Sequence, residues 1–455
     1  MLTAEARYQQ PWYRQLTRYH WLVLVLSSAG WLLDCMDQQL FGLARRPAVM
    51  ELLHARPDDA AMAGTVTEYA GYATMFFMIG WALGGVVFGI LGDRVGRVRT
   101  MVVSILFYSV FTGMSVFSTS VWDFSAYRLL TGLGVGGQFA VGVALVAEVL
   151  PPNVRPFALG ALQSCSAAGN ILAALVGIAL GNLQQAHVIE SSWRAMFVIG
   201  ALPAFLVFVI MRRLEEPEAW RKAKAEGAAH RVKLGSVTEL FTAPRWRRNA
   251  IVGFTLAFAG VVGLWGIGYF SYDLLSSVLD KTFRAQGLSE SVIAGKKTMW
   301  TGITSLVQNT GAFIGVYAFT YFTQRFGRRL AFAIALIAAM FATAFLFWRL
   351  RDFSDVFWMP PMMGFFQLAL YAGYAIYFPE LFPTRLRSTG TSFCYNVGRG
   401  VAAVGPVGLG LLTSRVFNGY QEPLRMAGVT MSAVFLIGLA ALPWAPETRG
   451  KPLPE

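Results

Sequence analysis

Residues 148–155, Glu-Val-Leu-Pro-Pro-Asn-Val-Arg, and residues 380–387, Glu-Leu-Phe-Pro-Thr-Arg-Leu-Arg, share the pattern Glu-x-x-Pro-x-x-x-Arg at a separation of 232 residues. Other marks repeat at nearly the same separation: Arg94-Val95-Gly96-Arg97 with Arg325-Phe326-Gly327-Arg328, Arg194 with Arg425, and Pro217-Glu218 with Pro446-Glu447. The chain of 455 residues therefore consists of two copies of one unit, each about half of its length.

The composition places this duplicated chain in a membrane. Hydrophobic residues make up 55% of it and charged residues 14%, against roughly 25% charged in soluble domains. The mean hydropathy is +0.51. The net charge of +13 does not indicate a nucleic-acid partner, because the basic residues lie in short loops between apolar runs. Paired halves in such a chain are typical of transporters with a site between the two copies.

The sequence indicates neither an enzyme nor a bound cofactor. The three cysteines, Cys35, Cys165 and Cys394, lie inside apolar runs and suggest neither a disulfide framework nor a metal site. The motifs H-E-x-x-H, G-x-S-x-G and G-x-x-x-x-G-K-[ST] are absent from the sequence, so hydrolase chemistry and an ATP-driven pump are not supported.

Twelve runs of about 20 or more mostly apolar residues can each cross a ~30 Å hydrocarbon core. They lack strand-like alternation, so we expect helices. The predicted fold is an all-α membrane protein with twelve transmembrane helices in two six-helix bundles, related by an axis along the membrane normal. The predicted spans are 20–43, 66–91, 98–119, 122–149, 156–182, 193–213, 249–274, 298–322, 329–349, 354–381, 388–415 and 424–445.

The spans and the basic residues together predict the domains and the orientation. With the amino terminus inside, 24 of the 38 Lys and Arg lie in inner segments and 12 in outer segments. This excess favours cytoplasmic termini. The expected domains are a cytoplasmic N-tail at 1–19, a first bundle at 20–213, a cytoplasmic linker at 214–248, a second bundle at 249–445 and a cytoplasmic C-tail at 446–455. The linker lacks an apolar run, and part of it could form amphipathic helix on the inner membrane surface.

Two stretches of the first half resemble signatures of the major facilitator superfamily, and the resemblance covers nearly the whole chain. Residues 89–99, Gly-Ile-Leu-Gly-Asp-Arg-Val-Gly-Arg-Val-Arg, resemble its loop G-x-x-x-D-R-x-G-R-x-R. Residues 128–136, Arg-Leu-Leu-Thr-Gly-Leu-Gly-Val-Gly, resemble the R-x-x-x-G-x-G-x-G signature of its fourth helix. The resemblance implies a monomeric transporter whose partners are a small-molecule substrate, protons and the lipid bilayer.

Other motifs are similar to one branch of this superfamily. Residues 379–383 with Arg387, and the ending 446–450, resemble sugar porters, aromatic-acid/proton symporters and organic-ion transporters. Residues 216–220, Glu-Pro-Glu-Ala-Trp, resemble bacterial metabolite transporters of that branch, which implies a bacterial inner membrane. The second half departs from the pattern, because Gln324 stands where the loop would have Asp and Thr320 where it would have Gly. We therefore expect the inner latch to be stronger on the first-half side.

The loop charges predict a gate at the inner side. Asp93 can face a helix amino terminus, whose dipole favours a carboxylate. In the family that helix is the eleventh, so the resemblance implies that Asp93 latches the halves near Ser388. The alternative is a set of solvated charges that only orients the protein. We expect ion pairs within each half, Glu148 with Arg97 and Arg155, and Glu380 with Arg328 and Arg387. The full predicted gating set is Gly89, Asp93, Arg94, Gly96, Arg97, Glu148, Arg155, Arg325, Arg328, Glu380 and Arg387.

Two acids of the first span are candidates for proton coupling. Asp34 and Asp37 are three residues apart and lie on one helix face. A carboxylate near the middle of the membrane costs on the order of 2.5–3.5 kcal/mol, so it should face a cavity or a partner. The resemblance aligns Asp37 with the acid that pairs with the arginine of the fourth helix, here Arg128, in proton-coupled members. The alternative is a static Asp37–Arg128 pair in a facilitator.

The candidate substrate site centres on Arg399, in the predicted span 388–415. Its planar guanidinium suits a carboxylate, and aromatic-acid and organic-anion transporters resemble this chain in carrying an arginine there. Alternatively Arg399 is neutralised internally, by Asp34 for instance. Polar and aromatic residues of other spans would complete the site: Gln138, Gln163, Asn170, Gln308, Asn309, Gln367, Tyr371, Tyr374 and Asn396.

These features predict secondary active transport of a small organic anion, an aromatic or other metabolite carboxylate, by alternating access with proton symport. A sugar/proton symporter is the first alternative, because the loop motifs are shared with sugar porters. An organic cation transporter is the second, because Asp34 and Asp37 could hold a cation. A non-transporting membrane sensor is less favoured, because no signalling domain is apparent.

Overall fold

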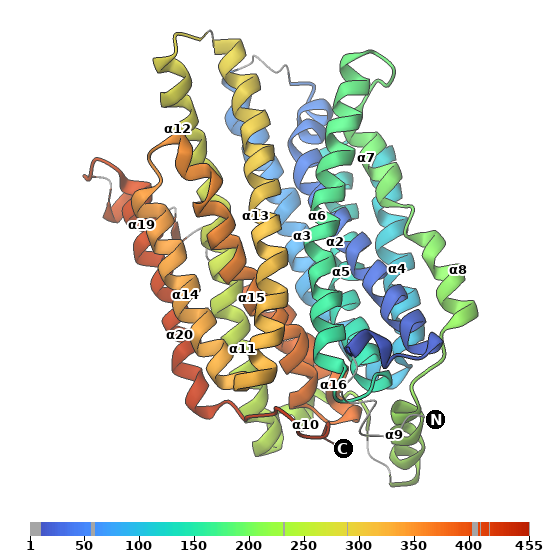
Figure 1. The fold of residues 1–455 in the computed structure, drawn as a ribbon. Helices are drawn as coiled ribbons and strands as arrows, with labels where there is room; N and C mark the ends of the chain where they lie inside the picture. Colours follow the sequence, from blue (N-terminus) through green and yellow to red (C-terminus); the bar gives the residue numbers. More distant parts are fainter. Residues whose placement is uncertain are drawn as a thin grey trace. The chain divides into compact units, whose positions relative to one another are not determined.

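The computed structural model describes residues 11–55, 60–230, 233–288, 290–402, 408–409, 411–417 and 419–454. These residues form helices joined by turns, without a β-strand among them (Figure 1). The all-α prediction is therefore confirmed. The predicted N-tail lies partly outside the described residues, as do positions 403–407 and 410 of the span predicted at 388–415.

The first half of the chain folds into helices, two of which, beginning at Arg18 and Val121, start with a capping box. They are α2 (Arg18–Leu52), α3 (Ala60–Arg94), α4 (Arg97–Met114), α5 (Val121–Val149), α6 (Arg155–Gln185), α7 (Ser192–Gly200) and α8 (Ala204–Arg213). Ser120 and Asp123 form a reciprocal capping box that begins α5. The predicted span 193–213 is divided into α7 and α8 by a turn that ends at Pro203, which lacks the N–H that a continuous helix needs.

The linker and the second half contain more interruptions. The linker holds α9 (Glu218–His230) and α10 (Val237–Thr242). Long helices follow: α11 (Pro244–Val261), α12 (Ser271–Ala285), α13 (Glu290–Phe326), α14 (Arg328–Arg349) and α15 (Met359–Leu381). The last region has α16 (Arg387–Ser392), α17 (Gly398–Ala402), α19 (Pro423–Met431) and α20 (Phe435–Ala441). Short π-helical segments, η3 (Val262–Ile267), η7 (Phe393–Val397) and η8 (Leu412–Val416), interrupt the regular helices.

Nine helical stretches of the described chain are long and apolar enough to cross a membrane. They correspond to nine of the twelve predicted spans. The spans predicted at 298–322 and 354–381 fall on α13 and α15, which contain polar residues such as Gln308 and Tyr371. The span predicted at 388–415 is divided among α16, η7 and α17 and extends beyond the described residues.

The chain forms two compact units. Unit 1 comprises Met1–Ala250, Phe378–Gly400 and Gly450–Glu455, and unit 2 comprises Ile251–Tyr377 and Val401–Arg449. Unit 1 therefore contains α16 and η7, which belong to the second half of the sequence. In Figure 1, α9, α10 and α16 lie at the same end of unit 1.

Glycines permit close packing of the helices that carry the Gly-rich signature. In unit 1, a Cβ at Gly84 of α3 would collide with the carbonyl oxygen of Leu133, and one at Gly136 of α5 would collide with that of Trp81. In unit 2, a Cβ at Gly315 of α13 would collide with the carbonyl oxygen of Phe365. Helices that approach so closely need small residues at the contact.

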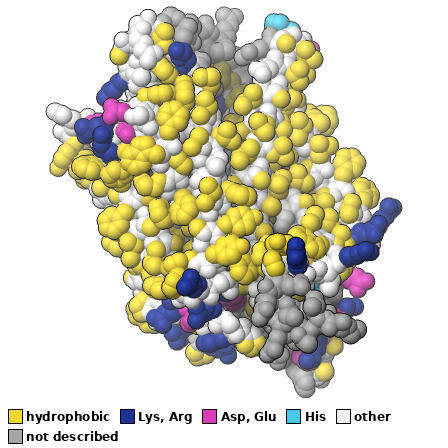
Figure 2. Space-filling model, viewed as in Figure 1, with side chains coloured by type: hydrophobic (Ala, Val, Ile, Leu, Met, Phe, Trp, Pro, Cys, Tyr) yellow, Lys and Arg dark blue, Asp and Glu magenta, His cyan; other side chains and the backbone are white. Residues whose placement is uncertain are grey.

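The surface of the helices is suited to lipid. On the face drawn in Figure 2, hydrophobic side chains cover the middle of the helices, and Lys, Arg, Asp and Glu gather toward their ends. Large apolar side chains are exposed, including Phe205 at 67% and Phe341 at 63%. Such apolar surface would be unfavourable in water but suits the hydrocarbon core of a bilayer.

The repeated arginines Arg194 and Arg425 have the same role in the two units. Arg194 of α7 donates to the carbonyl oxygens of Val116 and Ser118, just after α4. Arg425 of α19 donates to Phe347 and Leu350 at the end of α14. Each guanidinium thus satisfies helix carbonyls that have no intrahelical donor.

Replacing Arg425 by alanine should destabilise unit 2. Arg425 is 7% exposed, and its loss leaves buried carbonyl oxygens without donors. Hydrogen bonds to charged groups contribute about 1.5–3 kcal/mol each, so we expect a clear fall in the unfolding temperature of the purified protein in detergent. Arg349→Ala, at the exposed end of the same helix α14, is the control and should have a smaller effect. Equal shifts for both variants would contradict this role.

Candidate functional site

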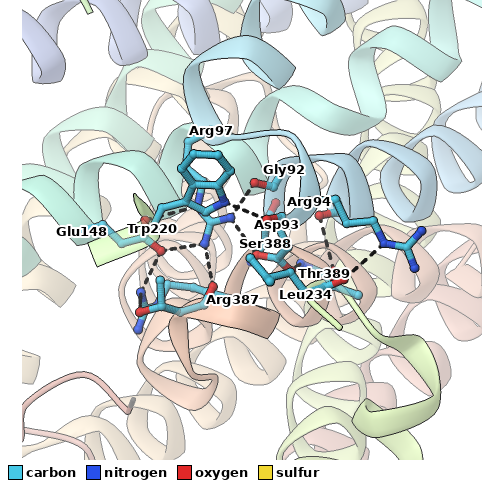
Figure 3. Close-up of polar contacts among 12 residues, drawn as sticks. Gly92, Asp93, Arg94, Arg97, Glu148, Trp220, Leu234, Arg387, Ser388 and Thr389 are labelled. Carbon is cyan, nitrogen blue, oxygen red and sulfur yellow. Dashed lines mark hydrogen bonds and ion pairs between the residues drawn. The ribbon is translucent and has the colours of Figure 1, made fainter. Parts of the chain in front are cut away.

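The carboxylate of Asp93 lies at the start of α16 (Figure 3). It accepts hydrogen bonds from the backbone N–H of Ser388 at 3.1 Å, from that of Thr389 at 2.9 Å and from the Thr389 hydroxyl at 2.6 Å. Asp93 is fully buried, at the end of α3. Its charge therefore meets the donor end of α16, where the helix dipole favours an anion. The latch predicted near Ser388 has this geometry.

Asp93 belongs to a buried chain of four alternating charges. Arg97 lies 2.8 Å from Asp93 and 2.8 Å from Glu148, and Arg387 lies 2.7 Å from the same oxygen of Glu148. None of the four side chains is more than 1% exposed. The two acids and two bases balance, which offsets the large cost of removing each charge from water. Arg97 also donates to the carbonyl oxygen of Thr384 at 2.7 Å.

This pairing corrects two expectations. Arg387 contacts Glu148, from the other half of the sequence, and not Glu380, because α16 packs with its first turn against α3 and α5. Arg155 donates to the carbonyl oxygen of Leu150 and forms no direct ion pair with Glu148 within the described chain.

The linker also contacts this cluster, a contact that the sequence analysis did not predict. The Trp220 indole donates to the carbonyl oxygen of Asp93 at 2.7 Å, and Arg94 donates to that of Leu234 at 3.1 Å (Figure 3). The backbone N–H of Gly235 donates to the carbonyl oxygen of Arg385 at 2.8 Å. A tryptophan within a polar linker was the signal in the sequence for a buried contact.

Gly235 itself sits against the latch. Its φ of +62° is in the left-handed region, and an added Cβ would lie 3.0 Å from the carbonyl oxygen of Ile90 and 3.3 Å from both Asp93 and Thr389. Only a residue without a side chain fits this turn without displacing its neighbours. Glu239 of α10 pairs with Arg385 at 2.8 Å and anchors the linker beyond the turn.

A glutamate caps the corresponding helix in each half. Glu216 accepts from the backbone N–H of Arg97 at 2.6 Å, and Glu447 accepts from that of Arg328 at 3.0 Å. The structural equivalent of Glu447 is thus Glu216, and not Glu218 as the sequence match suggested. Burial alone would raise the pKa of Glu447, but backbone N–H groups, that of Arg328 foremost, lower it below its usual value.

The remaining predicted gating residues lie at the ends of helices. Gly89 and Gly96 are at close contacts, with Gly89 against Ser392 and Gly96, at φ +130°, against Glu216. In unit 2 the backbone carbonyl of Arg325 accepts from Arg449. Residue 324 is a glutamine, so the loop of the second half has no carboxylate at the position that corresponds to Asp93.

The two acids of α2 are completely buried in unit 1. Asp34 accepts a hydrogen bond from Gln38 at 3.0 Å. Gln38 lies one helical turn after Asp34, and the sequence analysis did not predict it as a partner. Asp37 makes no hydrogen bond of normal geometry within the described chain, and the groups that face it are Arg128 and Thr112.

Arg128 does not form the direct ion pair that was expected with Asp37. Its guanidinium lies 4.5 Å from the ring centroid of Phe197 and donates to the hydroxyl of Ser115 and to the carbonyl oxygen of Phe111. The two charges are near enough to interact electrostatically, but aromatic rings and helix carbonyls hold the guanidinium.

Arg399 is 6% exposed and lies among rings of unit 1. It donates to the hydroxyl of Tyr395 at 2.8 Å, and its guanidinium carbon lies 3.9 Å from the ring centroid of Trp81. Asp34 is near enough to interact with it electrostatically. Asn396 donates to the carbonyl oxygen of Gly136 at 3.0 Å and joins η7 to α5.

The other predicted substrate residues divide between the units. Gln138 and Gln163 are buried in unit 1, where Gln163 donates to Ser166 at 3.3 Å and Asn170 is half-buried on the same helix. In unit 2, several are engaged in contacts between neighbouring residues or helices. Gln308 accepts from Tyr272, Asn309 donates to Ser305, Gln367 donates to Gly263 and Thr343, and Tyr374 donates to Leu256 and packs against Tyr371.

In the part of the chain that the structure describes, no group of three or more His, Cys, Asp and Glu residues could hold a metal ion. The buried charges Asp93, Arg97, Glu148 and Arg387 pair with one another, and Arg128 and Arg399 contact aromatic rings. The arrangement can bind an anion at Arg399 and can hold a proton on a buried carboxylate of α2.

Comparisons with known proteins agree with this architecture. The family model described as Major Facilitator Superfamily matches residues 28–406. A probable 4-methylmuconolactone transporter of Cupriavidus pinatubonensis is 29% identical, over 93% of this chain and 89% of its own length. A cis,cis-muconate transport protein of Acinetobacter baylyi is 28% identical, over 76% of this chain and 79% of its own.

A solved structure has the same fold. The proton:xylose symporter XylE bound to 6-bromo-6-deoxy-D-glucose superposes with a TM-score of 0.70 at 16% identity, covering 96% of this chain and 98% of XylE. The family match extends over most of the chain and includes the signature loop and the fourth-helix signature. The chain therefore belongs to the major facilitator superfamily and is an integral membrane transporter rather than an enzyme.

Proposed function

We propose that this protein is a secondary active transporter that moves a small organic anion by alternating access, with proton symport. The observation that carries the proposal is Arg399, a buried guanidinium held against Trp81 and Tyr395. A guanidinium binds a carboxylate through two parallel hydrogen bonds, and burial makes this interaction stronger than in water. A small aromatic or other metabolite carboxylate fits this chemistry.

Proton coupling is assigned to the acids of α2. Asp37 is buried, faces Arg128 and lacks the hydrogen bonds that normally stabilise a buried carboxylate. Movement of Arg128 toward or away from Asp37 would change the stability of its charged form, which links the protonation of Asp37 to the conformation. Asp34 lies near both Asp37 and Arg399 and can connect the two sites.

The relatives support an anion more than the alternatives. The transporters of muconate and of 4-methylmuconolactone are named for an organic anion and a lactone. A sugar/proton symporter remains the first alternative, favoured by the fold shared with XylE. An organic cation is the second, favoured by the buried pair Asp34 and Asp37.

The proposed setting is a bacterial inner membrane, in which the protein is a monomer with both termini in the cytoplasm. The bacterial relatives support the compartment, and the excess of Lys and Arg in the predicted inner segments supports the orientation. With this orientation, the cluster of Asp93, Arg97, Glu148 and Arg387 is an inner gate in its closed state, and the linker covers it.

Asp37→Asn should abolish accumulation of substrate driven by an imposed proton gradient, because the amide cannot take up the proton. Exchange of labelled for unlabelled substrate across the same vesicles should persist, because it needs no net proton movement. Asp280→Asn, at a partly exposed position of α12, is the control and should leave accumulation unchanged. Wild-type accumulation in Asp37→Asn would remove Asp37 as the coupling acid.

Arg399→Ala should weaken carboxylate binding roughly ten- to hundredfold, because a charge-assisted hydrogen bond contributes about 1.5–3 kcal/mol. Arg399→Lys should bind with intermediate affinity, because lysine keeps the positive charge but cannot form the two parallel hydrogen bonds of a guanidinium. Direct binding measurements at fixed pH on folded protein test this. If Arg399 is instead an internal counter-ion, the double variant with Asp34→Asn should restore folding and much of the binding lost in Arg399→Ala.

Gly235→Ala should open the inner gate, because the added Cβ would press on Ile90, Asp93 and Thr389. Gly287→Ala is a matched control, since Gly287 also has a left-handed φ, +71°, but an added Cβ meets no atom within 4 Å. Labelling of Thr391→Cys, a buried position on α16, should rise with Gly235→Ala and with Asp93→Asn but not with Gly287→Ala. A cysteine-free background is needed, and equal labelling in all variants would argue against the gate.

A further inference from the structure

Four aromatic rings form a continuous set of contacts with the guanidinium of Arg399. The guanidinium carbon lies 3.9 Å from the ring centroid of Trp81 and 4.6 Å from that of Tyr395. The Tyr395 ring in turn stacks on Phe139, with centroids 3.9 Å apart and planes at 19°. Trp31 lies against the same Phe139, with centroids 5.0 Å apart. Arg399 thus contacts both Trp81 and Tyr395, and the rings of Phe139 and Trp31 continue from Tyr395.

The backbone fixes the place of these rings. Tyr395 lies in the π-helical segment η7, a local irregularity of the kind often found at functional sites. Its neighbour Asn396 is bonded to the carbonyl oxygen of Gly136, two residues before Gln138 and three before Phe139. Trp81 is on α3, 5% exposed. The rings therefore come from four elements of unit 1, namely α2, α3, α5 and η7. The hydrogen bond of Asn396 joins η7 to α5 independently of the ring stacking.

Buried polar atoms beside the rings point to a ligand. Both amide atoms of Gln138, 1% exposed, have no hydrogen-bond partner in the described part of the chain, and neither has the indole nitrogen of Trp31, 3% exposed. Gln138 precedes Phe139 and lies against Gly30, the residue before Trp31. A buried amide without partners is costly, and a substrate with a second polar group would satisfy it.

We infer that Trp81 and Tyr395 are positioning residues for Arg399 and that Phe139 is a specificity-determining residue, which selects flat carboxylates over puckered ones. This rests on the proposed function, namely that Arg399 binds an organic anion. Rings stacked on a guanidinium occupy its faces and leave its edge for the carboxylate. A carboxylate conjugated with a ring lies in the plane of that ring, so a substrate bound at this edge would be flat where it meets the neighbouring rings of Tyr395 and Phe139. A saturated ring is thicker and makes poorer stacking contacts.

The test compares benzoate with cyclohexanecarboxylate, which has the same carbon skeleton but a puckered ring. Binding of each to the purified protein is measured at fixed pH, and D-xylose is included. We expect the wild-type protein to prefer benzoate and Phe139→Leu to reduce this preference roughly two- to tenfold, the range that corresponds to one aromatic stacking contact. Tyr395→Phe keeps the ring and loses the hydroxyl that holds Arg399, so it should weaken both carboxylates alike and keep their ratio.

Phe283→Leu is the control for loss of a buried ring. Phe283 is 4% exposed in unit 2, in a hydrophobic cluster away from Arg399 in the sequence and in the other compact unit, and its loss should leave the ratio unchanged. Because the readout is a ratio of two ligands, a general loss of folded protein cancels. An unchanged ratio in Phe139→Leu, or equal binding of both carboxylates by the wild type, would overturn the inference and leave the anion proposal standing. Binding of xylose without either carboxylate would overturn the proposed function itself.

Discussion

The constraint on which unit 1 depends is that every charge buried at the proposed inner gate must be compensated by another buried group. Asp93, Arg97, Glu148 and Arg387 contact almost no solvent, and each isolated charge would cost several kcal/mol. The chain meets this constraint with alternating signs and with the first N–H groups of α16. Such a cluster is stable only when all its members are present, because removal of one leaves another charge buried and unpaired. This all-or-none character suits a gate.

Much of this could be read from the sequence because charge is conspicuous in an apolar chain. The apolar runs predict the helices, the repeat of Glu-x-x-Pro-x-x-x-Arg predicts two similar halves, and the resemblance of the loop to the family signature implies the contact of Asp93 near Ser388. A guanidinium within a membrane span is equally conspicuous, so Arg399 could be identified from its position in an apolar run of the sequence.

The partners of these residues were harder to predict, because pairing depends on how helices dock. The motif repeats suggested that Glu380 would hold Arg387, yet the docking of α16 on α3 and α5 brings Arg387 to Glu148. Arg128 was expected to form an ion pair with Asp37, but its guanidinium lies against rings such as that of Phe197. This contact could not be predicted, because aromatic neighbours leave no regular pattern in an already hydrophobic sequence. Gly235 is one of 46 glycines in the sequence, and only its backbone φ and its contacts in the structure distinguish it from the others.

The gate also imposes an order on biosynthesis. Glu148 and its partner Arg387 are 239 residues apart, and at about 5–20 residues per second the ribosome needs roughly 12 to 48 seconds to make the intervening chain. During that interval Asp93, Arg97 and Glu148 are present with one negative charge in excess, at the level of the membrane where insertion is decided. The charge balance of this cluster is therefore complete only after Arg387 has been synthesised.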